Sequence, residues 1–305
     1  MDFRQLQYIV AVADCHSITA AARQLFISQP SLSFAISQIE KEVGAPLFDR
    51  NQHPIALTDA GKIYVKGARE ILQKSLEIKN RIADLQTGRG GGISLGIPAE
   101  RAGYMLPPII NKFRESYPDS AFSIQEAGTA QLLELLRNNK VNFIVCPLSE
   151  EVVSVDMTKE LIYYESVQLV ASPDRITDKM LLDKEKRLLD FKKLAALPFI
   201  GVKKNHSIHY KARAIFQQYG VEPQLLMEVD SSSTAAQLAA CGLGFTLVPR
   251  RAVKILGPER NRYCFAYSRQ PVRWEIDAIY KKSTYLNKAE RFFITLLQQE
   301  FSTHE

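Results

Sequence analysis

The fold of the N-terminal part is decided by one stretch, Ser17-Ile18-Thr19-Ala20-Ala21-Ala22-Arg23-Gln24-Leu25, followed by Phe26-Ile27-Ser28-Gln29-Pro30-Ser31-Leu32-Ser33-Phe34. In the first run the apolar residues share one helical face, at Ile18, Ala21, Ala22 and Leu25. A short break follows, and Ser28 then caps a second helix in which Pro30 takes an early position, where its missing N–H is harmless. Two short helices with a tight break predict a helix-turn-helix.

The second of these helices is predicted to bury one stripe and to expose the other. The buried stripe has 4, 3 and 4 spacing at Leu32, Ile36, Ile39 and Val43. The opposite face is mostly polar and carries Gln29, Ser31, Ser33, Phe34, Ser37 and Gln38. Residues 46–58 then place a turn between two short apolar runs, which would serve as a wing. On spacing alone, an ordinary three-helix bundle remains an alternative.

Beyond this motif the chain divides at a glycine-rich stretch, Gly88-Arg89-Gly90-Gly91-Gly92. Residues 3–87 contain few Gly or Pro and read as almost entirely helical. After the glycines, short apolar runs alternate with amphipathic segments. Strands are expected at Ile93–Ile97, Phe122–Glu126, Val141–Cys146, Leu161–Ala171, Phe199–Val202, Leu225–Val229, Phe245–Val248 and Trp274–Tyr280. Helices are expected over 103–116, 129–139, 207–219, 233–241 and 287–301, so the pattern predicts mostly parallel sheets with helices on both faces, in two subdomains.

Length and charge narrow the classes of protein further. The chain has 305 residues and a formal net charge of +6, which permits an anionic partner without demanding one. Residues 1–58 nevertheless hold four Lys/Arg against five Asp/Glu, so charge alone does not indicate a nucleic-acid module there. No apolar run approaches the roughly 18 residues of a membrane span, and the first apolar stretch is too short for a signal peptide. We therefore expect no membrane association and a cytoplasmic location.

The sequence contains no strong motif for catalysis, metal binding or cofactor binding. The four cysteines (Cys15, Cys146, Cys241 and Cys264) stand far apart, and the five histidines do not cluster with them, so we expect small buried or half-buried thiols, no metal site and no cofactor. Gly242-Leu243-Gly244 follows a helix and precedes a strand, the reverse of a dinucleotide loop. The run at 231–234 lacks the glycine frame of a nucleophile elbow. The sequence predicts no enzyme, although a solute-binding protein or an enzyme with a vestigial helix-turn-helix remains an alternative.

The order of residues in the N-terminal motif closely resembles the LysR-type transcriptional regulators. The resemblance is carried by Ala21-Ala22, Leu25, Ile27-Ser28-Gln29-Pro30-Ser31-Leu32-Ser33, Ile36, Ile39-Glu40, Gly44-Ala45-Pro46-Leu47-Phe48-Asp49-Arg50 and Leu57-Thr58-Asp59-Ala60-Gly61. It continues through Leu106-Pro107-Pro108, Glu126-Ala127-Gly128-Thr129 and Val229-Asp230-Ser231, and ends with Gly242-Leu243-Gly244 and Leu247-Val248-Pro249. It therefore covers nearly the whole chain.

The resemblance implies a modular architecture and a function. It implies a winged helix-turn-helix at 1–58, a linker and dimerisation helix at 59–87 and a glycine hinge at 88–92. It further implies two Rossmann-like lobes, as in periplasmic binding proteins of type 2, at 93–163 with 266–305 and at 164–265, with crossovers near 162–164 and 266–268. The expected function is sequence-specific binding of double-stranded DNA, modulated by a small-molecule effector in the cleft between the lobes.

In the DNA-binding part, the resemblance places the second helix in the major groove. Gln29 suits a bidentate contact to adenine, and Ser33 suits several bases. Ser31 and Thr58 are better placed for phosphates. Phe34 departs from the polar residue common in the family, and either packs against a neighbouring helix or meets a thymine methyl group. The expected DNA-binding set is Gln29, Pro30, Ser31, Ser33, Phe34, Ser37, Arg50, His53 and Thr58.

The wing contains only two expected cations, Arg50 and His53. Because so few charges give weak DNA affinity, we expect two or more DNA-binding heads to act together. A seven-residue repeat at Tyr64, Ile71, Ile78 and Leu85, interleaved with Ala68, Ser75 and Ile82, predicts a coiled-coil seam. Packing of this helix against its own domain is the alternative. The expected dimerisation residues are Tyr64, Ala68, Ile71, Ile78, Ile82 and Leu85, and the family resemblance implies a dimer of dimers that contacts RNA polymerase.

The resemblance also places effector contacts at the carboxyl ends of strands and at helix N-termini. These positions are Pro98, Ala99, Glu100, Arg101, Thr129, Val202, Lys203, Lys204, Asn205, Phe245 and Thr246. The alternatives are that Thr129 only caps a helix and that Lys203-Lys204 is a solvated pair. Glu100 departs from the Ser or Thr common among relatives, and a carboxylate there repels an anionic effector unless Arg101 or Lys203 pairs with it. We therefore expect an effector that bears both charges or a cationic group.

Overall fold

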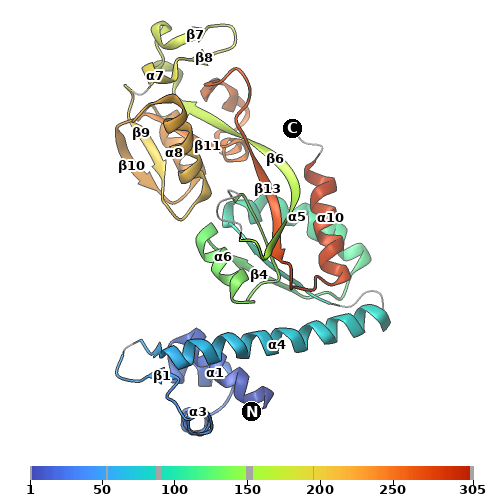
Figure 1. Ribbon diagram of the computed structural model, residues 1–305. Helices are drawn as coiled ribbons and strands as arrows, with labels where there is room; N and C mark the ends of the chain where they lie inside the picture. Colours follow the sequence, from blue (N-terminus) through green and yellow to red (C-terminus); the bar gives the residue numbers. More distant parts are fainter. Residues whose placement is uncertain (1, 53, 87–90, 149–153, 195, 303–305) are drawn as a thin grey trace. The chain divides into compact units, whose positions relative to one another are not determined.

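The computed structural model describes residues 2–52, 54–86, 91–148, 154–194 and 196–302 (Figure 1). His53, Gly88, Arg89 and Gly90, which belong to the predicted wing and hinge, lie outside the described residues. The chain divides into two compact units that meet in sequence at Gly91 and Gly92. In the described part of the chain, no helix is long and apolar enough to cross a membrane.

The N-terminal unit is a winged helix-turn-helix, as predicted. Its elements are α1 (Phe3–Cys15), α2 (Ile18–Gln24), α3 (Gln29–Val43), the antiparallel pair β1 (Phe48–Asp49) and β2 (Ala56–Leu57), and α4 (Asp59–Gln86). Ser17 accepts a hydrogen bond from the Ala20 N–H and Ser28 accepts one from the Ser31 N–H, so both helices of the motif are capped as their sequence indicates. The turn between them holds Phe26 at a φ of +56°.

The core of this unit lies where α1, α2 and α3 meet. Leu32, Ile36 and Ile39 are buried there, as the stripe on α3 predicts. Val43 was expected to continue the stripe, but it is 43% exposed. The reason is that α3 ends at Val43 and the chain turns at Gly44, whose φ of +77° terminates the helix. The last residue of the stripe therefore lies beyond the packed core.

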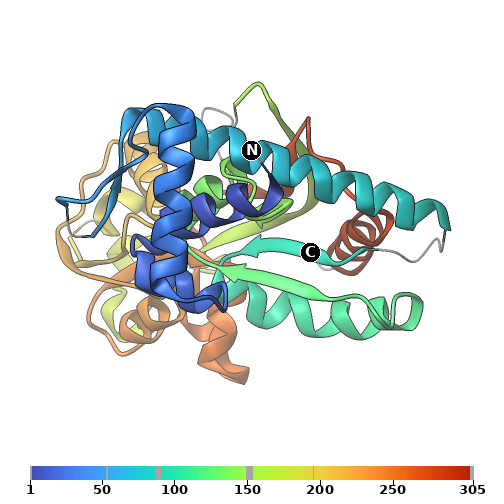
Figure 2. The ribbon, with the colours of Figure 1, turned by 90° about the horizontal axis from the view of Figure 1, so that it is seen from below.

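The α4 helix extends from the wing as one uninterrupted element of 28 residues (Figures 1 and 2). Val65 is buried in the core of the N-terminal unit, with Tyr64 packed beside it. Farther along the helix, several apolar side chains are exposed instead, at Ile71, Leu76, Ile78 and Ile82. The start of α4 thus belongs to the N-terminal core, and its later turns carry an apolar face without a partner in the described chain.

The second unit is a mixed α/β structure. Its strands are β3 (Ile93–Ile97), β4 (Phe122–Glu126), β5 (Phe143–Cys146), β6 (Met157–Ala171), β7 (Leu181–Asp183), β8 (Leu188–Leu189), β9 (Phe199–Val202), β10 (Leu225–Val229), β11 (Phe245–Pro249), β12 (Cys264–Phe265) and β13 (Arg273–Lys281). Its α-helices are α5 (Ala99–Ser116), α6 (Thr129–Arg137), α7 (Phe191–Leu194), α8 (Ser207–Tyr219), α9 (Ser232–Ala240) and α10 (Lys288–Phe301). Short 3₁₀ helices follow β6 and β11, at Pro173–Arg175, Asp178–Met180, Arg250–Leu256 and Pro258–Tyr263.

Two long strands join two lobes. The strand order is β10-β9-β11-β6-β13-β5-β3-β4, with parallel pairing at each end and antiparallel pairing around β6 and β13. The strand β6 pairs with β13 as far as Ser166 and with β11 from Val167 onward. The first lobe contains β3, β4, β5 and helices α5, α6 and α10. The second contains β9, β10, β11 and helices α7, α8 and α9. Figure 2 shows β3 and β4 running side by side, in agreement with their pairing.

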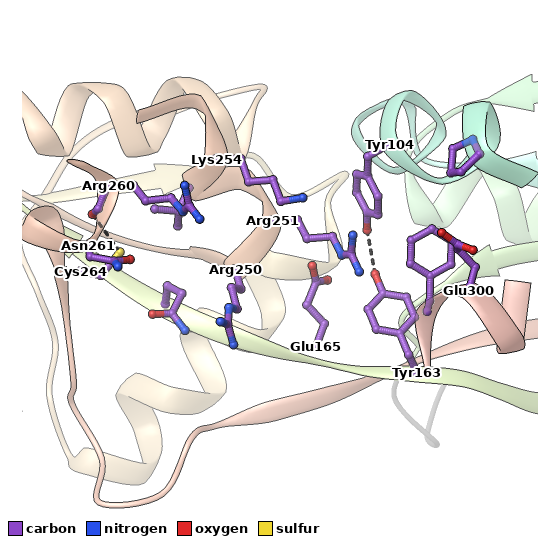
Figure 3. Close-up of a pocket in the computed structure, with 14 residues that line it drawn as sticks. Tyr104, Tyr163, Glu165, Arg250, Arg251, Lys254, Arg260, Asn261, Cys264 and Glu300 are labelled. Atoms are coloured by element: carbon purple, nitrogen blue, oxygen red, sulfur yellow. Dashed lines mark hydrogen bonds between the residues drawn. The ribbon is translucent and has the colours of Figure 1, made fainter. Parts of the chain in front are cut away.

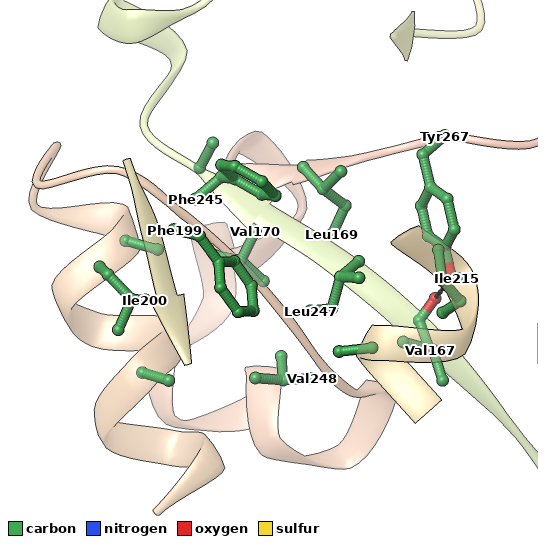
Figure 4. Close-up of a cluster of buried hydrophobic side chains, with 14 of the residues drawn as sticks. Val167, Leu169, Val170, Phe199, Ile200, Ile215, Phe245, Leu247, Val248 and Tyr267 are labelled. Atoms are coloured by element: carbon green, nitrogen blue, oxygen red, sulfur yellow. Dashed lines mark hydrogen bonds between the residues drawn. The ribbon is translucent and has the colours of Figure 1, made fainter. Parts of the chain in front are cut away.

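Each lobe has a core of its own. In the second lobe, Leu169 and Val170 of β6 pack with Phe199, Ile215 and Phe245 (Figure 4). In the first lobe, helices α5 and α10 cover the sheet around Phe113, Phe143 and Phe293. Each lobe therefore buries its apolar side chains around its own part of the sheet.

Candidate functional site

The exposed face of α3 carries the residues expected to read DNA. Gln29, Pro30, Ser31 and Ser37 are exposed and Ser33 is half-buried. Several of the serines also have local hydrogen bonds, because the Ser31 Oγ lies 2.7 Å from the Ser28 Oγ and the Ser37 Oγ donates to the Ser33 carbonyl. The serine side chains of this face are therefore short, polar and held by local hydrogen bonds.

Phe34 lies in the middle of this face with 67% of its surface exposed. Of the two alternatives for this residue, the described part of the unit shows no packing against a neighbouring helix. A large apolar side chain is thus presented between polar neighbours, and Phe26 in the preceding turn is 96% exposed. Apolar contact with the methyl group of thymine is a recognised form of base readout.

The wing cation Arg50 is engaged within the unit itself. Its Nη2 donates to the Glu40 Oε2 at 2.9 Å and to the Ser37 Oγ at 3.2 Å. The Glu40 Oε1 accepts from the backbone N–H groups of Leu47 and Phe48. Glu40 therefore holds the start of the wing against α3 and also neutralises Arg50.

Thr58 has a structural role in this unit. Its Oγ1 donates to the Pro46 carbonyl at 2.7 Å and accepts from the Gly61 N–H at 2.9 Å, so it caps the start of α4. His53, the other expected wing cation, lies outside the described residues.

The expected dimerisation residues divide into two groups on α4. Tyr64 packs against the core of the N-terminal unit and Ala68 is buried. Ile71, Ile78 and Ile82 are 39%, 51% and 50% exposed. Leu85 lies in the last turn of the same helix.

A cleft of about 380 Å³ lies between the two lobes of the α/β unit. The beginnings of four helices, α5, α6, α8 and α9, contribute residues to it. Of the expected effector contacts, it brings together Pro98, Ala99, Glu100, Arg101 and Thr129. Thr129 begins α6, and its Oγ1 lies 2.6 Å from the Ser207 Oγ, so the hydroxyl bridges the lobes.

The other expected contacts do not line the cleft. Phe245 is fully buried in the core of the second lobe, and Thr246 is buried and donates to the Ile200 carbonyl at 2.8 Å. Val202 is buried at the end of β9, Lys203 pairs with Asp230 at 2.7 Å, and the remaining two lie exposed beside it, at Lys204 and Asn205. Val202 ends β9, and Lys203, Lys204 and Asn205 lie between β9 and α8, whereas the cleft lining begins at His206. Phe245 and Thr246 begin β11, whereas the cleft is lined from its other end, at Pro249.

Sequence reasoning missed the residues that replace them. The second lobe supplies His206, Ser207 and Ile208 around the start of α8, residues 230–233 around the start of α9, and three residues at and after the end of β11, namely Pro249, Arg251 and Ala252. Ser231 could have been found as a helix cap, because serine is a favoured N-cap residue. In the structure its Oγ accepts from the N–H groups of Ser233 and Thr234. The remaining residues gave no signal, since their approach to the cleft depends on how β6 and β13 join the lobes.

Glu100 bridges the cleft. It lies in the first turn of α5, and its Oε1 accepts from the Ser231 Oγ at 2.6 Å and from the Ser233 N–H at 3.2 Å. The positive end of α9 stabilises a carboxylate at this position. The cation partners proposed for Glu100 are elsewhere: Arg101 pairs with Glu165, and Lys203 pairs with Asp230.

Arg101 is buried in a polar network at the back of the cleft. Its guanidinium bonds to the Glu165 carboxylate at 2.7 Å and to the hydroxyls of Tyr104 and Tyr163, both at 2.9 Å. Burial lowers the pKa of Arg101, but Glu165 and the two tyrosines raise it further, so the pKa lies well above its ordinary value and the group stays charged. Burial likewise raises the pKa of Tyr104 and of Tyr163, so both hydroxyls stay protonated. Three of these side chains, Arg101, Tyr104 and Glu165, line the back wall of the cleft.

Two family models match this chain. The model of the bacterial regulatory helix-turn-helix protein of the LysR family matches residues 3–62, and that of the LysR substrate binding domain matches residues 86–302. The chain belongs to the LysR family. It is a LysR-type, DNA-binding transcriptional regulator with an effector-binding domain, and it belongs to a family of regulators rather than of enzymes.

Relatives and solved structures of the LysR family extend over nearly the whole chain. The uncharacterised regulator YybE of Bacillus subtilis (strain 168) is 28% identical over 82% of this chain and 82% of its own. BsdA of the same organism is 27% identical over 97% of this chain and 100% of its own. A full-length, singly substituted OxyR of Pseudomonas aeruginosa has a TM-score of 0.73 at 19% identity, covering 98% of this chain and 94% of that chain. Full-length CbnR in complex with its target DNA has a TM-score of 0.63 at 21% identity, covering 98% and 99%.

Proposed function

We propose that this LysR-family regulator reads DNA with the exposed face of α3. The observation that carries the proposal is that Gln29, Ser31, Phe34 and Ser37 share that face and are exposed. Gln29 reads an adenine by a bidentate contact, Ser33 a second base, and Phe34 a thymine methyl group. Ser31 and Thr58 are proposed to contact phosphates. The rest of the proposed DNA-binding set is Pro30 and Ser37 on α3 and the wing residues Arg50, which pairs with Glu40, and His53.

The proposed assembly follows from the weak charge of each head. Ile71, Ile78 and Ile82 present an apolar face on α4, and a second copy of α4 is its proposed partner. The resulting pair places two α3 helices about one helical turn of DNA apart, roughly 34 Å. We propose a dimer of dimers in which effector binding changes the spacing of the heads and so the contact with RNA polymerase.

We propose that the functions of the regulator are divided along the chain at the domain boundaries expected from the sequence. Residues 1–58 read DNA, 59–87 dimerise, and 88–92 form a hinge. Residues 93–163 with 266–305 and residues 164–265 form the two effector-binding subdomains. As a regulator that acts on DNA, the protein is proposed to work in the cytoplasm.

The chemistry of the cleft supports an effector with a cationic group. Glu100 and Glu126 line it, together with Asp230, which pairs with Lys203, while the buried Arg101 is already neutralised by Glu165. The Glu100 carboxylate occupies the start of α9, where a ligand carboxylate would otherwise bind. An effector amine placed beside Glu100, with any carboxylate directed toward Arg251, fits these charges better than a simple dicarboxylate does.

DNA binding is tested by incubating the purified chain with fragmented genomic DNA near physiological salt and sequencing the retained fragments. We expect a few discrete sites that contain interrupted inverted repeats. Substitution of Gln29 by Ala should relax the preference at one position of each half-site, because the side chain is exposed and its loss leaves the fold intact. Uniform recovery of all fragments would contradict the assignment of α3.

The effector proposal is tested with succinate, a plain dicarboxylate, by titration calorimetry. We expect weak binding to the unaltered chain and at least tenfold tighter binding to Glu100→Ser, because the substitution removes the carboxylate from the start of α9. Glu222→Ser, an exposed position outside the cleft, serves as the control for net charge. Tight binding of succinate that Glu100→Ser does not strengthen would refute the proposal.

A further inference from the structure

The α/β unit contains a second, larger cavity. It measures about 690 Å³ and is lined by β6, α5, α10 and the 3₁₀ helices Arg250–Leu256 and Pro258–Tyr263 (Figure 3). Cavities that hold small ligands in proteins commonly measure about 300–1,000 Å³. Three residues, Tyr104, Glu165 and Arg251, line both this cavity and the cleft. The two spaces therefore share a wall.

The cavity is strongly basic. Four cations line it, namely Arg250, Arg251, Lys254 and Arg260. None of the four forms an ion pair with any residue that the structure describes. The two acids in its lining are already neutralised, Glu165 by Arg101 at 2.7 Å and Glu300 by Lys112 at 2.5 Å. The charge that this basic cavity offers to a ligand is therefore positive.

Aromatic rings hold one of the cations in place. The Arg251 guanidinium carbon lies 4.8 Å from the ring centroids of Tyr104 and Phe301 and 5.4 Å from that of Tyr163. These rings fix the guanidinium by cation–π contact and leave its N–H groups to donate. Figure 3 shows the other three cations, Arg250, Lys254 and Arg260, on the side of the cavity formed by the second lobe. Such a row suits a ligand that carries more than one negative charge.

Glu165 supplies a second, independent sign of a ligand. Its side chain is 2% exposed, and its Oε2 accepts from Arg101 and, at 3.3 Å, from the Trp274 indole N–H. Its Oε1 is buried and has no hydrogen-bond partner among the described residues. Figure 3 shows this carboxylate directed toward Arg251. A buried acceptor without a donor is costly in a folded protein, and a donor on a ligand satisfies it.

We propose that the basic cavity binds a small anion with two or more negative charges and a hydroxyl group, such as a phosphorylated or carboxylated hydroxy compound. Arg250, Arg251, Lys254 and Arg260 hold the anionic groups, and the Glu165 Oε1 accepts from the hydroxyl. Since Glu165, Tyr104 and Arg251 also line the cleft, this ligand alters the wall of the effector cleft. The regulator thus senses two ligands of opposite charge preference.

The test uses the full chain at constant ionic strength, with pyrophosphate, citrate and tricarballylate as probes in titration calorimetry. We expect pyrophosphate or citrate to bind, depending on whether the cavity prefers phosphate or carboxylate groups. The affinity of the probe that binds should fall at least tenfold in the double variant Lys254→Gln/Arg260→Gln. The matched control, Lys192→Gln/Lys282→Gln, removes two exposed lysines outside both cavities and should change binding less than twofold. Arg250→Gln provides a second variant if the double one unfolds.

Two further readouts identify the mode of binding. Trp274 is the single tryptophan of the chain, and its bond to Glu165 should make its fluorescence respond to the anion. Citrate should bind more tightly than tricarballylate, which lacks only the hydroxyl. Equal loss in the double variant and its control, no binding of any probe, or competition by DNA for the same cations would overturn the proposal. Equal affinity for citrate and tricarballylate would overturn the role of Glu165.

Discussion

The DNA-binding head and the segment that follows β11 distribute charge in opposite ways. The first 58 residues contain four Lys/Arg and five Asp/Glu, and the wing cation Arg50 is paired with Glu40. Residues 250–262 contain five Lys/Arg and a single acid. Four of those five cations line the basic cavity and none of the four is ion-paired among described residues.

This difference shows that a basic net charge does not locate the nucleic-acid surface. In this regulator four cations without an ion pair among the described residues lie around the basic cavity, whereas the face proposed to read DNA is polar and apolar. Phosphate contacts provide most of the salt-dependent part of DNA affinity. A head with so few cations is therefore expected to depend on pairing with a second head and on base contacts.

The largest effect is expected from separating the heads. Ile78→Glu places a charge on the exposed apolar face of α4 and should dissociate the dimer. Because pairing of binding modules raises affinity by two to four orders of magnitude, DNA affinity should fall on the order of 100-fold. Sedimentation and DNA binding measure the two effects. Ile63→Glu, which is 76% exposed and off the seven-residue repeat, is the control. Tight DNA binding by a monomeric Ile78→Glu variant would show that the head does not depend on pairing.

A cation added to the reading face should have the next largest effect. Phe34→Arg places a charge at an exposed position on α3 and should tighten binding about tenfold at low salt. The slope of log affinity against log salt should steepen by about 0.9 for each new phosphate contact. The measurement is a salt titration of binding to one site. An unchanged slope would show that Phe34 does not face the DNA.

Release of the wing cation Arg50 from its ion pair with Glu40 should strengthen DNA binding by a smaller amount. Glu40→Gln keeps an acceptor for the Leu47 and Phe48 N–H groups but removes the charge that pairs with Arg50. Freed in this way, Arg50 should tighten DNA binding about threefold through one phosphate contact. Glu42→Gln changes the same charge at an exposed neighbouring position. Equal gains in both variants would mean that Arg50 plays no special part.

The smallest effect concerns the thiol at the basic cavity. Burial raises the pKa of Cys264, although Arg187, Arg260 and Arg250 lower it. Since the thiolate is the reactive form, Cys264 should label more slowly at pH 8 than the exposed Cys241, and its rate should rise as pH increases. Arg260→Gln removes one stabilising cation and should slow labelling about twofold. Peptide mass spectrometry after timed alkylation gives both rates. Faster labelling in the variant would show that access, not charge, controls this thiol.

Much of the fold could be predicted from the sequence because it is local. The strands Ile93–Ile97, Phe122–Glu126, Phe199–Val202 and Leu225–Val229 begin and end where expected. Each is four or five residues long and contains recurring apolar side chains. The helix α8 over Ser207–Tyr219 is likewise as predicted, since its amphipathic period and the following Gly220 define it.

Elements without a local pattern were not predicted. The 3₁₀ helices over residues 250–263, the short strands β7, β8 and β12, and the short α7 helix fall in this class. The strand β6 begins at Met157, four residues before the expected Leu161, because β13 pairs along its whole first half. Cys241, expected to be buried or half-buried, is exposed. Each of these outcomes depends on neighbours distant in sequence.

By itself, the sequence determined the helix-turn-helix, the alternation of strands and helices, and the resemblance to the LysR family, because caps, periods and motifs are properties of adjacent residues. Only the tertiary structure decided which charges are paired. The sequence left open whether Arg101 or Lys203 pairs with Glu100, and in the structure each of these two cations pairs with another acid. The basic cavity likewise exists only because β6 and β13 bring two lobes together, and ion pairing is set by distance in space rather than by order along the chain.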